Sequence, residues 1–224
     1  ATAIAPSRSR DGSTLLMINS HQPLTGPVSW YEAHLQSGEG LNVMGGLFIG
    51  APALGVGFSE HHGWGATVNQ PDLVDIFVLD IDPEDDNRYR VDGDWLALEE
   101  FDIPIKVRLW GWLPWTVKEK GYRSIHGPVM KTDHGTYAVR YAGMNEIRQV
   151  EQWLAMSAAR SFEEWRAALA LQHIASFNFV YANADGVIHF VHNAMMPERS
   201  KGRRWAQYLP GDREDLIGEG CLPP

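Results

Sequence analysis

The feature that most constrains the fold is a series of short apolar runs along the first 80 residues. Each run has three to six residues, and Gly, Pro and Asn residues separate the runs from one another. Apolar runs of this length, bounded by turn residues, are typical of strands with tight connections. We therefore predict strands at residues 14–18, 30–35, 41–45, 56–58, 63–68 and 75–79.

The pattern loosens between residues 80 and 141. This part begins with an acidic, turn-rich stretch, DIDPEDDNRYRVDGDW, and then gives two further strand candidates at residues 103–109 and 136–141. We interpret residues 80–141 as an inserted β region.

The clearest helical pattern follows this region. Residues 150–157 indicate a short helix, and Ser161 with Glu164 forms a capping box, in which each side chain can satisfy a free backbone N–H of the other residue. The next stretch, FNFVYANADGVIHFVHN, indicates a hairpin whose tight turn takes its positive φ angles from Asp185 and Gly186. This order of elements predicts an α+β fold, which we expect to be a single domain over residues 1–224.

Composition excludes several classes of function. The chain of 224 residues is 44% hydrophobic and 21% charged, which is typical of a soluble globular protein. Its formal net charge of −9 argues against nucleic acid as a partner, because phosphate binding needs clustered Lys and Arg. The locally basic run 199–204 is expected to be a solvated loop. No run approaches the 18 apolar residues of a membrane span, so no membrane partner is expected.

The content of Cys and Trp is also informative. The single cysteine, Cys221, allows neither a disulfide nor a Cys-based zinc site within the chain. The nine Trp residues are a high number, and we expect them to fill a core or to line an apolar cavity.

No common catalytic motif is present. The sequence has no Walker loop, GxGxxG, HExxH or GxSxG pattern. Glu60, His61 and His62 suggest a metal site, but adjacent histidines on a Gly-rich loop are expected to face solvent. His21 lies in a loop, where it is either an ordinary loop residue or a catalytic base.

Asp72 and Asp75 have two interpretations. Two carboxylates and the carbonyl of Val74 can meet at one Ca²⁺ ion, which takes six to eight oxygen ligands in loose geometry. Two Asp residues near a Pro also commonly mark a turn and a helix N-cap. The residues alone leave both interpretations open.

In their order and spacing, several separated stretches resemble the start of the β chain in the penicillin acylase family. The stretches are AIAPSRSRDGSTLLMINSHQPLTGPVSWYEAHL, GLNVMGGLFIGAPALGVGFSEHHGWGATVNQPDLVDIF, HGPV, EQWLAMSAARSFEEW and FNFVYANADGVIHFVHNAMMP. This family belongs to the N-terminal nucleophile hydrolases. The resemblance implies an αββα sandwich, here incomplete, with two antiparallel sheets between helices.

The resemblance also implies the chemistry. In the family, self-cleavage of a precursor exposes a serine whose hydroxyl attacks an amide, while its own α-amine, with a pKa of about 8, takes the proton. Aligned without a gap, that serine and an asparagine lie directly before Ala1; a gapped alignment instead places Ala1 at the nucleophile position. Either alignment leaves this chain without the nucleophile, so we expect it to be a fragment that is inactive by itself.

Other roles follow from the resemblance, residue by residue. Val68 matches the backbone donor of an oxyanion hole, and His21 the position beside the nucleophile. The matches to the acyl pocket are Leu24, Trp153 and Phe177. The matches to calcium ligands are Asp72, Val74, Asp75 and Pro197. The second oxyanion donor, an Asn, is expected beyond Pro224.

The expected function is that of a penicillin-acylase-like amide hydrolase, which removes the acyl group from N-acyl compounds such as β-lactam antibiotics. The alternatives are an acyl-homoserine lactone acylase and a non-catalytic module that binds calcium or a partner. The expected partners are a small N-acyl substrate, the α chain and the rest of the β chain, with Ca²⁺ and no organic cofactor. Relatives are periplasmic or secreted, so the parent protein is expected to be exported.

Overall fold

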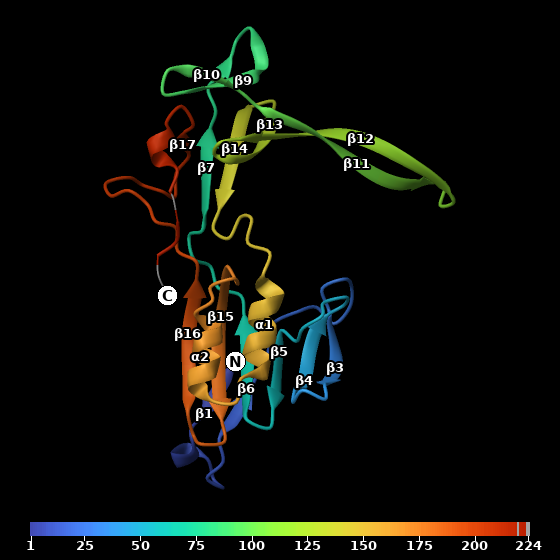
Figure 1. Cartoon of the computed structure of the whole chain (residues 1–224), viewed down its shortest axis with the longest axis vertical. Coiled ribbons are helices and arrows are strands. Elements are labelled where there is room, and N and C mark those ends of the chain that lie inside the picture. Colours follow the sequence, from blue (N-terminus) through green and yellow to red (C-terminus); the bar gives the residue numbers. More distant parts are fainter. Residues whose placement is uncertain (219, 223–224) are drawn as a thin grey trace. The chain divides into compact units, whose positions relative to one another are not determined.

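The computed structural model describes residues 1–218 and 220–222, and this part of the chain divides into two compact units (Figure 1). Unit 1 contains Ala1–Pro71 and Asn145–Met195, and unit 2 contains Asp72–Met144 and Met196–Leu222. The expectation of a single domain stays a prediction. No helix of the described residues is long and apolar enough to cross a membrane.

Unit 1 is built on a six-stranded antiparallel sheet in the order β16-β15-β6-β5-β4-β3. Its strands are β3 (Trp30–Gln36), β4 (Asn42–Phe48), β5 (Val56–Ser59), β6 (His62–Thr67), β15 (Ser176–Asn183) and β16 (Ile188–Ala194). A separate two-stranded sheet is formed by β1 (Thr2–Ile4) and β2 (Leu15–Met17), which a 3₁₀ turn at Pro6–Arg8 helps to connect.

Two helices, α1 (Gln149–Ala158) and α2 (Phe162–Leu169), lie side by side against one face of the six-stranded sheet (Figure 1). The core between them is strongly aromatic, and its fully buried members include Trp64, Met156, Trp165, Phe179 and Tyr181. Because the sheet and both helices contribute to this one cluster, it fixes the helices on the sheet.

The β1–β2 sheet approaches the six-stranded sheet where β6 has glycines. A Cβ atom at Gly63 would lie 2.9 Å from Leu16, and one at Gly65 would lie 2.8 Å from Ile18. The absence of side chains at Gly63 and Gly65 therefore permits this close contact.

Unit 2 contains a six-stranded sheet in the order β11-β12-β13-β14-β7-β17 and a three-stranded sheet in the order β10-β9-β8. The strands of the larger sheet are β7 (Val74–Val78), β11 (Glu99–Leu109), β12 (Leu113–Ser124), β13 (Gly127–Thr132), β14 (Gly135–Tyr141) and β17 (Leu209–Pro210). The smaller sheet contains β8 (Ile81–Asp82), β9 (Asp85–Val91) and β10 (Asp94–Ala97). A 3₁₀ turn at Glu214–Leu216 follows β17. Phe77, Tyr89 and Ala138 lie at the centre of the core of this unit.

The α+β content is confirmed, and the predicted strands of the first 80 residues are present with ends shifted by a few residues. The acidic stretch after residue 80 differs from the expectation, because it forms β8, β9 and β10 rather than only turns. Asp82 and Asp85 accept hydrogen bonds from the backbone N–H groups of Glu84 and Asn87, which stabilises the tight turn between β8 and β9.

The predicted helix start at Ser161 is confirmed. The Ser161 hydroxyl oxygen accepts a hydrogen bond from the Glu164 N–H at 3.1 Å. The Glu164 carboxylate accepts from the Arg160 N–H at 2.8 Å, one residue earlier than the capping box predicts. In the β15–β16 hairpin, only Gly186 has a positive φ, so the prediction for Asp185 was wrong.

Candidate active site

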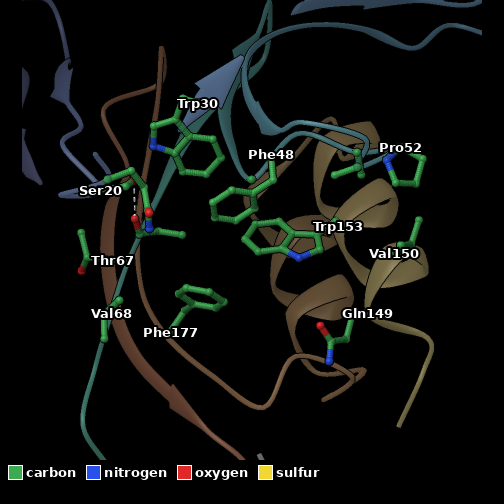
Figure 2. A pocket seen from close by; sticks show the side chains of 15 residues that line it. Ser20, Trp30, Phe48, Pro52, Thr67, Val68, Gln149, Val150, Trp153 and Phe177 are labelled. Carbon is green, nitrogen blue, oxygen red and sulfur yellow. Dashed lines mark hydrogen bonds between the residues drawn. The ribbon is translucent and has the colours of Figure 1, made fainter. Parts of the chain in front are cut away.

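Unit 1 contains a cavity of about 250 Å³ at one end of its sheet (Figure 2). At this end β3 and β15 begin, β4 and β6 finish, and α1 starts, so residues far apart in the sequence meet there. The lining residues are Ser20, Gln22, Trp30, Phe48, Ala51, Pro52, Ala53, Gly55, Ala66, Thr67, Val68, Gln149, Val150, Trp153 and Phe177.

Four aromatic side chains dominate this cavity. Trp30 and Phe48 are register partners on β3 and β4, and their rings stack with centroids 4.5 Å apart. Trp153 of α1 meets Phe177 of β15 edge to face, with centroids 6.0 Å apart. Figure 2 shows these four rings around one space. Such a lining suits an apolar group, since aromatic side chains provide a large apolar contact area.

Two backbone segments border the aromatic part. Ser20 is buried, and its hydroxyl donates a 2.7 Å hydrogen bond to the carbonyl oxygen of Ala66, which ties the loop after β2 to β6 (Figure 2). Val68 follows β6 at the edge of the cavity, and its carbonyl accepts a hydrogen bond from Asn178 Nδ2 at 3.2 Å. The residue that the resemblance assigns to the oxyanion hole therefore lies beside the aromatic cavity.

His21 and Leu24 are outside the lining. His21 is exposed and has a φ of 57°, and its backbone N–H donates to Asn19 Oδ1 at 2.8 Å. Its neighbours Ser20 and Gln22 both line the cavity, so His21 lies next to the site. Leu24 is 97% exposed. The roles of both residues stay predictions.

In unit 2, Arg199 binds the carboxylates of Asp72 and Asp75, which were expected to be metal ligands. Its guanidinium donates to all four oxygens: Nη1 and Nη2 to Asp72 at 3.1 and 3.3 Å, and Nη2 and Nε to Asp75 at 2.8 and 3.4 Å. The Arg199 side chain is only 13% exposed. The prediction that the run 199–204 is a solvated loop is therefore wrong for Arg199, because a buried ion pair holds it.

Burial raises the pKa of Asp75, and the hydrogen bonds and positive charge of Arg199 offset part of this effect. The Asp75 side chain is 7% exposed, whereas that of Asp72 is 48% exposed. Asp75 is therefore the carboxylate that depends more on the guanidinium.

This arrangement does not fit a calcium ion. Ca²⁺ needs six to eight oxygen ligands, and here every carboxylate oxygen of the pair already accepts a hydrogen bond from Arg199. The other two expected ligands have structural positions: Val74 starts β7, and Pro197 forms an isolated bridge with Cys221. Among the described residues, no group of three His, Cys, Asp or Glu side chains could hold a metal ion.

Only one of the two adjacent histidines, His61 and His62, faces solvent. His61 is exposed, whereas His62 is 3% exposed and stacks on Tyr181 with ring centroids 5.3 Å apart. His62 Nε2 lies 3.2 Å from the carbonyl oxygen of Met156, and burial lowers the pKa of this histidine. The solvent-facing prediction is wrong for His62, because the alternation along β6 directs it into the helix-covered core.

Sequence reasoning missed half of the aromatic lining. Trp153 and Phe177 were expected at an acyl pocket, and the structure brings them together. Trp30 and Phe48 were not singled out: Trp30 begins the predicted strand 30–35, whereas Phe48 lies three residues beyond the predicted strand 41–45 and is the last residue of β4. An aromatic residue at the start of a predicted strand was a signal that could have pointed to Trp30, whereas Phe48 joins it only through the pairing of β3 with β4.

A model of the penicillin amidase family matches residues 1–224. The chain therefore belongs to the penicillin amidase family.

Individual relatives agree with this assignment. The chain is similar to the acyl-homoserine lactone acylase PvdQ of Pseudomonas fluorescens, with 27% identity over 208 residues, covering 89% of this chain and 27% of that protein. It is also similar to the penicillin G acylase of Escherichia coli, with 27% identity over 212 residues, covering 93% of this chain and 24% of the relative. The chain thus spans about a quarter of the length of these curated relatives.

Among solved structures, a thermostable penicillin G acylase from Alcaligenes faecalis matches with a TM-score of 0.84 and 25% identity. The match covers 98% of this chain and 39% of the other chain.

Proposed function

We propose that this chain is the acyl-binding part of an amide hydrolase that removes the acyl group from N-acyl compounds, as penicillin acylases do. The aromatic cavity of unit 1 is the observation that carries the proposal. It places an apolar group against Trp30, Phe48, Trp153 and Phe177, next to the backbone of Val68. Membership of the penicillin amidase family supports the same reaction class.

The proposed nucleophile is a serine that precedes Ala1 in a longer polypeptide and becomes N-terminal by self-cleavage. Its hydroxyl oxygen attacks the carbonyl carbon of the amide, and its α-amine takes the hydroxyl proton and passes it to the leaving amine. Water then hydrolyses the acyl-enzyme. The match to only about a quarter of the length of these relatives supports this proposal. The proposed partners are an α chain and the remainder of the β chain.

Val68 is proposed to donate its backbone N–H to the oxygen of the tetrahedral intermediate. Such a donor accelerates the reaction because negative charge develops on that oxygen only as the intermediate forms. A complete αββα sandwich and export to the periplasm or the medium belong to the same proposal and rest on the family alone.

The size and lining of the cavity favour a compact acyl group. Ligand pockets usually enclose roughly 300–1,000 Å³, and this one encloses about 250 Å³ with four aromatic rings. An aromatic acyl group such as phenylacetyl can stack on these rings. The second candidate is an acyl-homoserine lactone, which the name of the Pseudomonas relatives favours.

Release of free amine by the longer polypeptide that contains this chain tests the proposal. We expect turnover of an N-phenylacetyl amide with a higher kcat/KM than that of a long-chain acyl-homoserine lactone. Trp153→Ala should lower kcat/KM for the aromatic substrate, while Trp95→Ala in unit 2 serves as a matched control. A folded and processed polypeptide that releases amine from neither substrate would overturn the proposed function.

A further inference from the structure

The hairpin formed by β11 and β12 extends beyond the rest of its sheet in unit 2 (Figure 1). β11 and β12 pair along their whole length, from Glu99 and Arg123 to Leu109 and Leu113. β12 pairs with β13 only over Tyr122–Ser124. The outer part of the hairpin, residues 104–118, is therefore a two-stranded ribbon that pairs with no further strand of the described part of the chain.

One face of this ribbon is apolar and exposed. Successive side chains of a strand point to opposite faces, and the register pairs Ile105 with Val117, Val107 with Trp115, and Leu109 with Leu113. These six residues form what we call the apolar face. Ile105 is 44% exposed and Trp115 is 57% exposed.

The turn adds two more exposed indoles. Trp110 is 80% exposed and Trp112 is 73% exposed, on either side of Gly111. Trp110 and Gly111 both have positive φ angles, 49° and 79°, as a tight hairpin turn requires. The expectation that the Trp residues fill a core or line a cavity is therefore wrong for Trp110, Trp112 and Trp115.

The opposite face of the ribbon is basic. Lys106, Arg108 and Lys118 alternate with the apolar face and are exposed, and residues 104–118 contain no acidic side chain. None of the three cations has an ion pair among the residues that the structure describes. A local charge of +3 in a chain whose formal charge is −9 needs its own explanation.

We propose that residues 104–118 bind the surface of an anionic lipid bilayer. Trp residues favour the membrane–water interface, an apolar face can enter the boundary between headgroups and acyl chains, and Lys and Arg are attracted to anionic headgroups. The ribbon combines all three features when its turn enters the interface first, because an end-on approach brings the two indoles of the turn, the apolar face and the opposite basic face to the headgroups together. The binding is peripheral and adds a property that the hydrolase function does not require.

A second copy of the chain is a less suitable occupant. β11 is an edge strand, and it contains Pro104, Lys106 and Arg108, which are residues that block pairing between edges. The positive charge of residues 104–118 also disfavours contact between two identical hairpins.

The test measures co-sedimentation of the 224-residue chain with vesicles of phosphatidylcholine alone and of equimolar phosphatidylcholine and phosphatidylglycerol. We expect binding to the anionic vesicles that weakens at high salt. Lys106→Gln/Arg108→Gln/Lys118→Gln should weaken binding roughly a hundredfold. The matched control is Lys201→Gln/Arg203→Gln/Arg204→Gln, which removes the same charge from the other basic run of unit 2 and should leave binding unchanged.

A second set of variants tests the indoles. Trp110→Ala/Trp112→Ala/Trp115→Ala should abolish quenching of Trp fluorescence by brominated phosphatidylcholine, whereas Tyr31→Ala/Phe190→Ala, at exposed aromatics of unit 1, should not. Because all three indoles are exposed, the fold should tolerate their removal.

Three results would overturn the proposal. The first is a lack of binding to anionic vesicles, or equal losses in both charge variants. The second is self-association of the chain in light scattering that the triple Trp variant abolishes, which would assign the face to a second copy. The third is vesicle binding by this chain but not by the longer polypeptide, which would show that its own remaining segments cover the ribbon.

Discussion

Arg199 and Asp75 are 124 residues apart in the sequence, and Arg199 Nη2 donates to Asp75 Oδ1 at 2.8 Å. Asp75 lies on β7, opposite Arg140 of β14, and Arg199 follows the bridge between Pro197 and Cys221. The ion pair thus joins the sheet of unit 2 to its last segment and leaves the carboxylate without a free oxygen.

We predict that Arg199→Ala lowers the free energy of unfolding by about 3 kcal/mol, because it leaves the buried Asp75 carboxylate without its cation. The penalty exists while Asp75 is charged. The variant should therefore regain stability on acidification, as the pH falls through the raised pKa of Asp75 towards 3.8. Urea unfolding at several pH values measures this. Arg213→Ala, which removes an exposed partner of Asp215, is the control and should change little.

The same variant tests the metal expectation. Calcium should not change the thermal midpoint of the unaltered chain, because a guanidinium already holds both carboxylates. Terbium luminescence sensitised by Trp205, whose ring lies 5.5 Å from the Arg199 guanidinium, should appear only after Arg199→Ala. Luminescence from the unaltered chain that Asp75→Asn abolishes would show that calcium-type ions displace Arg199.

Gln152 connects α1 to the end of α2 in the core of unit 1. It is fully buried, donates to the Leu169 carbonyl at 2.9 Å, and accepts from the backbone N–H groups of His173 and Ile174 at 2.7 and 2.8 Å. Gln152→Ala should cost about 3 kcal/mol, since three buried backbone groups lose their partner. Chemical denaturation measures the loss, and Gln149→Ala at the exposed start of α1 should have a small effect.

The stability of the chain should fall as the pH drops below about 6.5, the ordinary pKa of histidine. Burial lowers the pKa of His62 and of His126, so the unfolded chain binds protons that the folded chain does not. His62→Gln should reduce the slope of unfolding free energy against pH, and His126 should account for part of the remainder. An unchanged slope in His62→Gln, matching that of the exposed-site control His61→Gln, would refute this explanation.

The proposed oxyanion role of Val68 can be tested in the proposed longer polypeptide. Val68→Pro removes the backbone N–H and should lower kcat roughly a hundredfold or more, because one donor to the intermediate is lost. Val68→Ala retains the N–H and should retain most activity. Equal activity of the two variants, with the fold checked by circular dichroism, would remove Val68 from the mechanism.

The sequence predicted those elements whose signals are local. Ser161 begins a helix because its own side chain caps it, and the strands follow runs of apolar residues between turn residues. Arg199 could not be placed in this way, because its partners are more than 120 residues away and nothing in its own polar and charged neighbourhood points to them.

The site was predicted only in part, for a related reason. Trp153 and Phe177 came from the family resemblance, while Trp30 and Phe48 join them through the register of β3 and β4. Trp110 is exposed because the hairpin extends beyond the rest of its sheet. The sequence could not predict this exposure, since a Trp-rich stretch has the same composition in a core and on a surface.

The central claim is that the aromatic cavity of unit 1 binds an acyl group, and phenylacetate provides the most direct test. Titration of the 224-residue chain with this ligand, followed by NMR of assigned resonances, should shift signals of Trp30, Trp153, Phe177 and Val68, and Trp153→Ala should abolish these shifts. Shifts that cluster elsewhere, or that persist in Trp153→Ala, would contradict the claim.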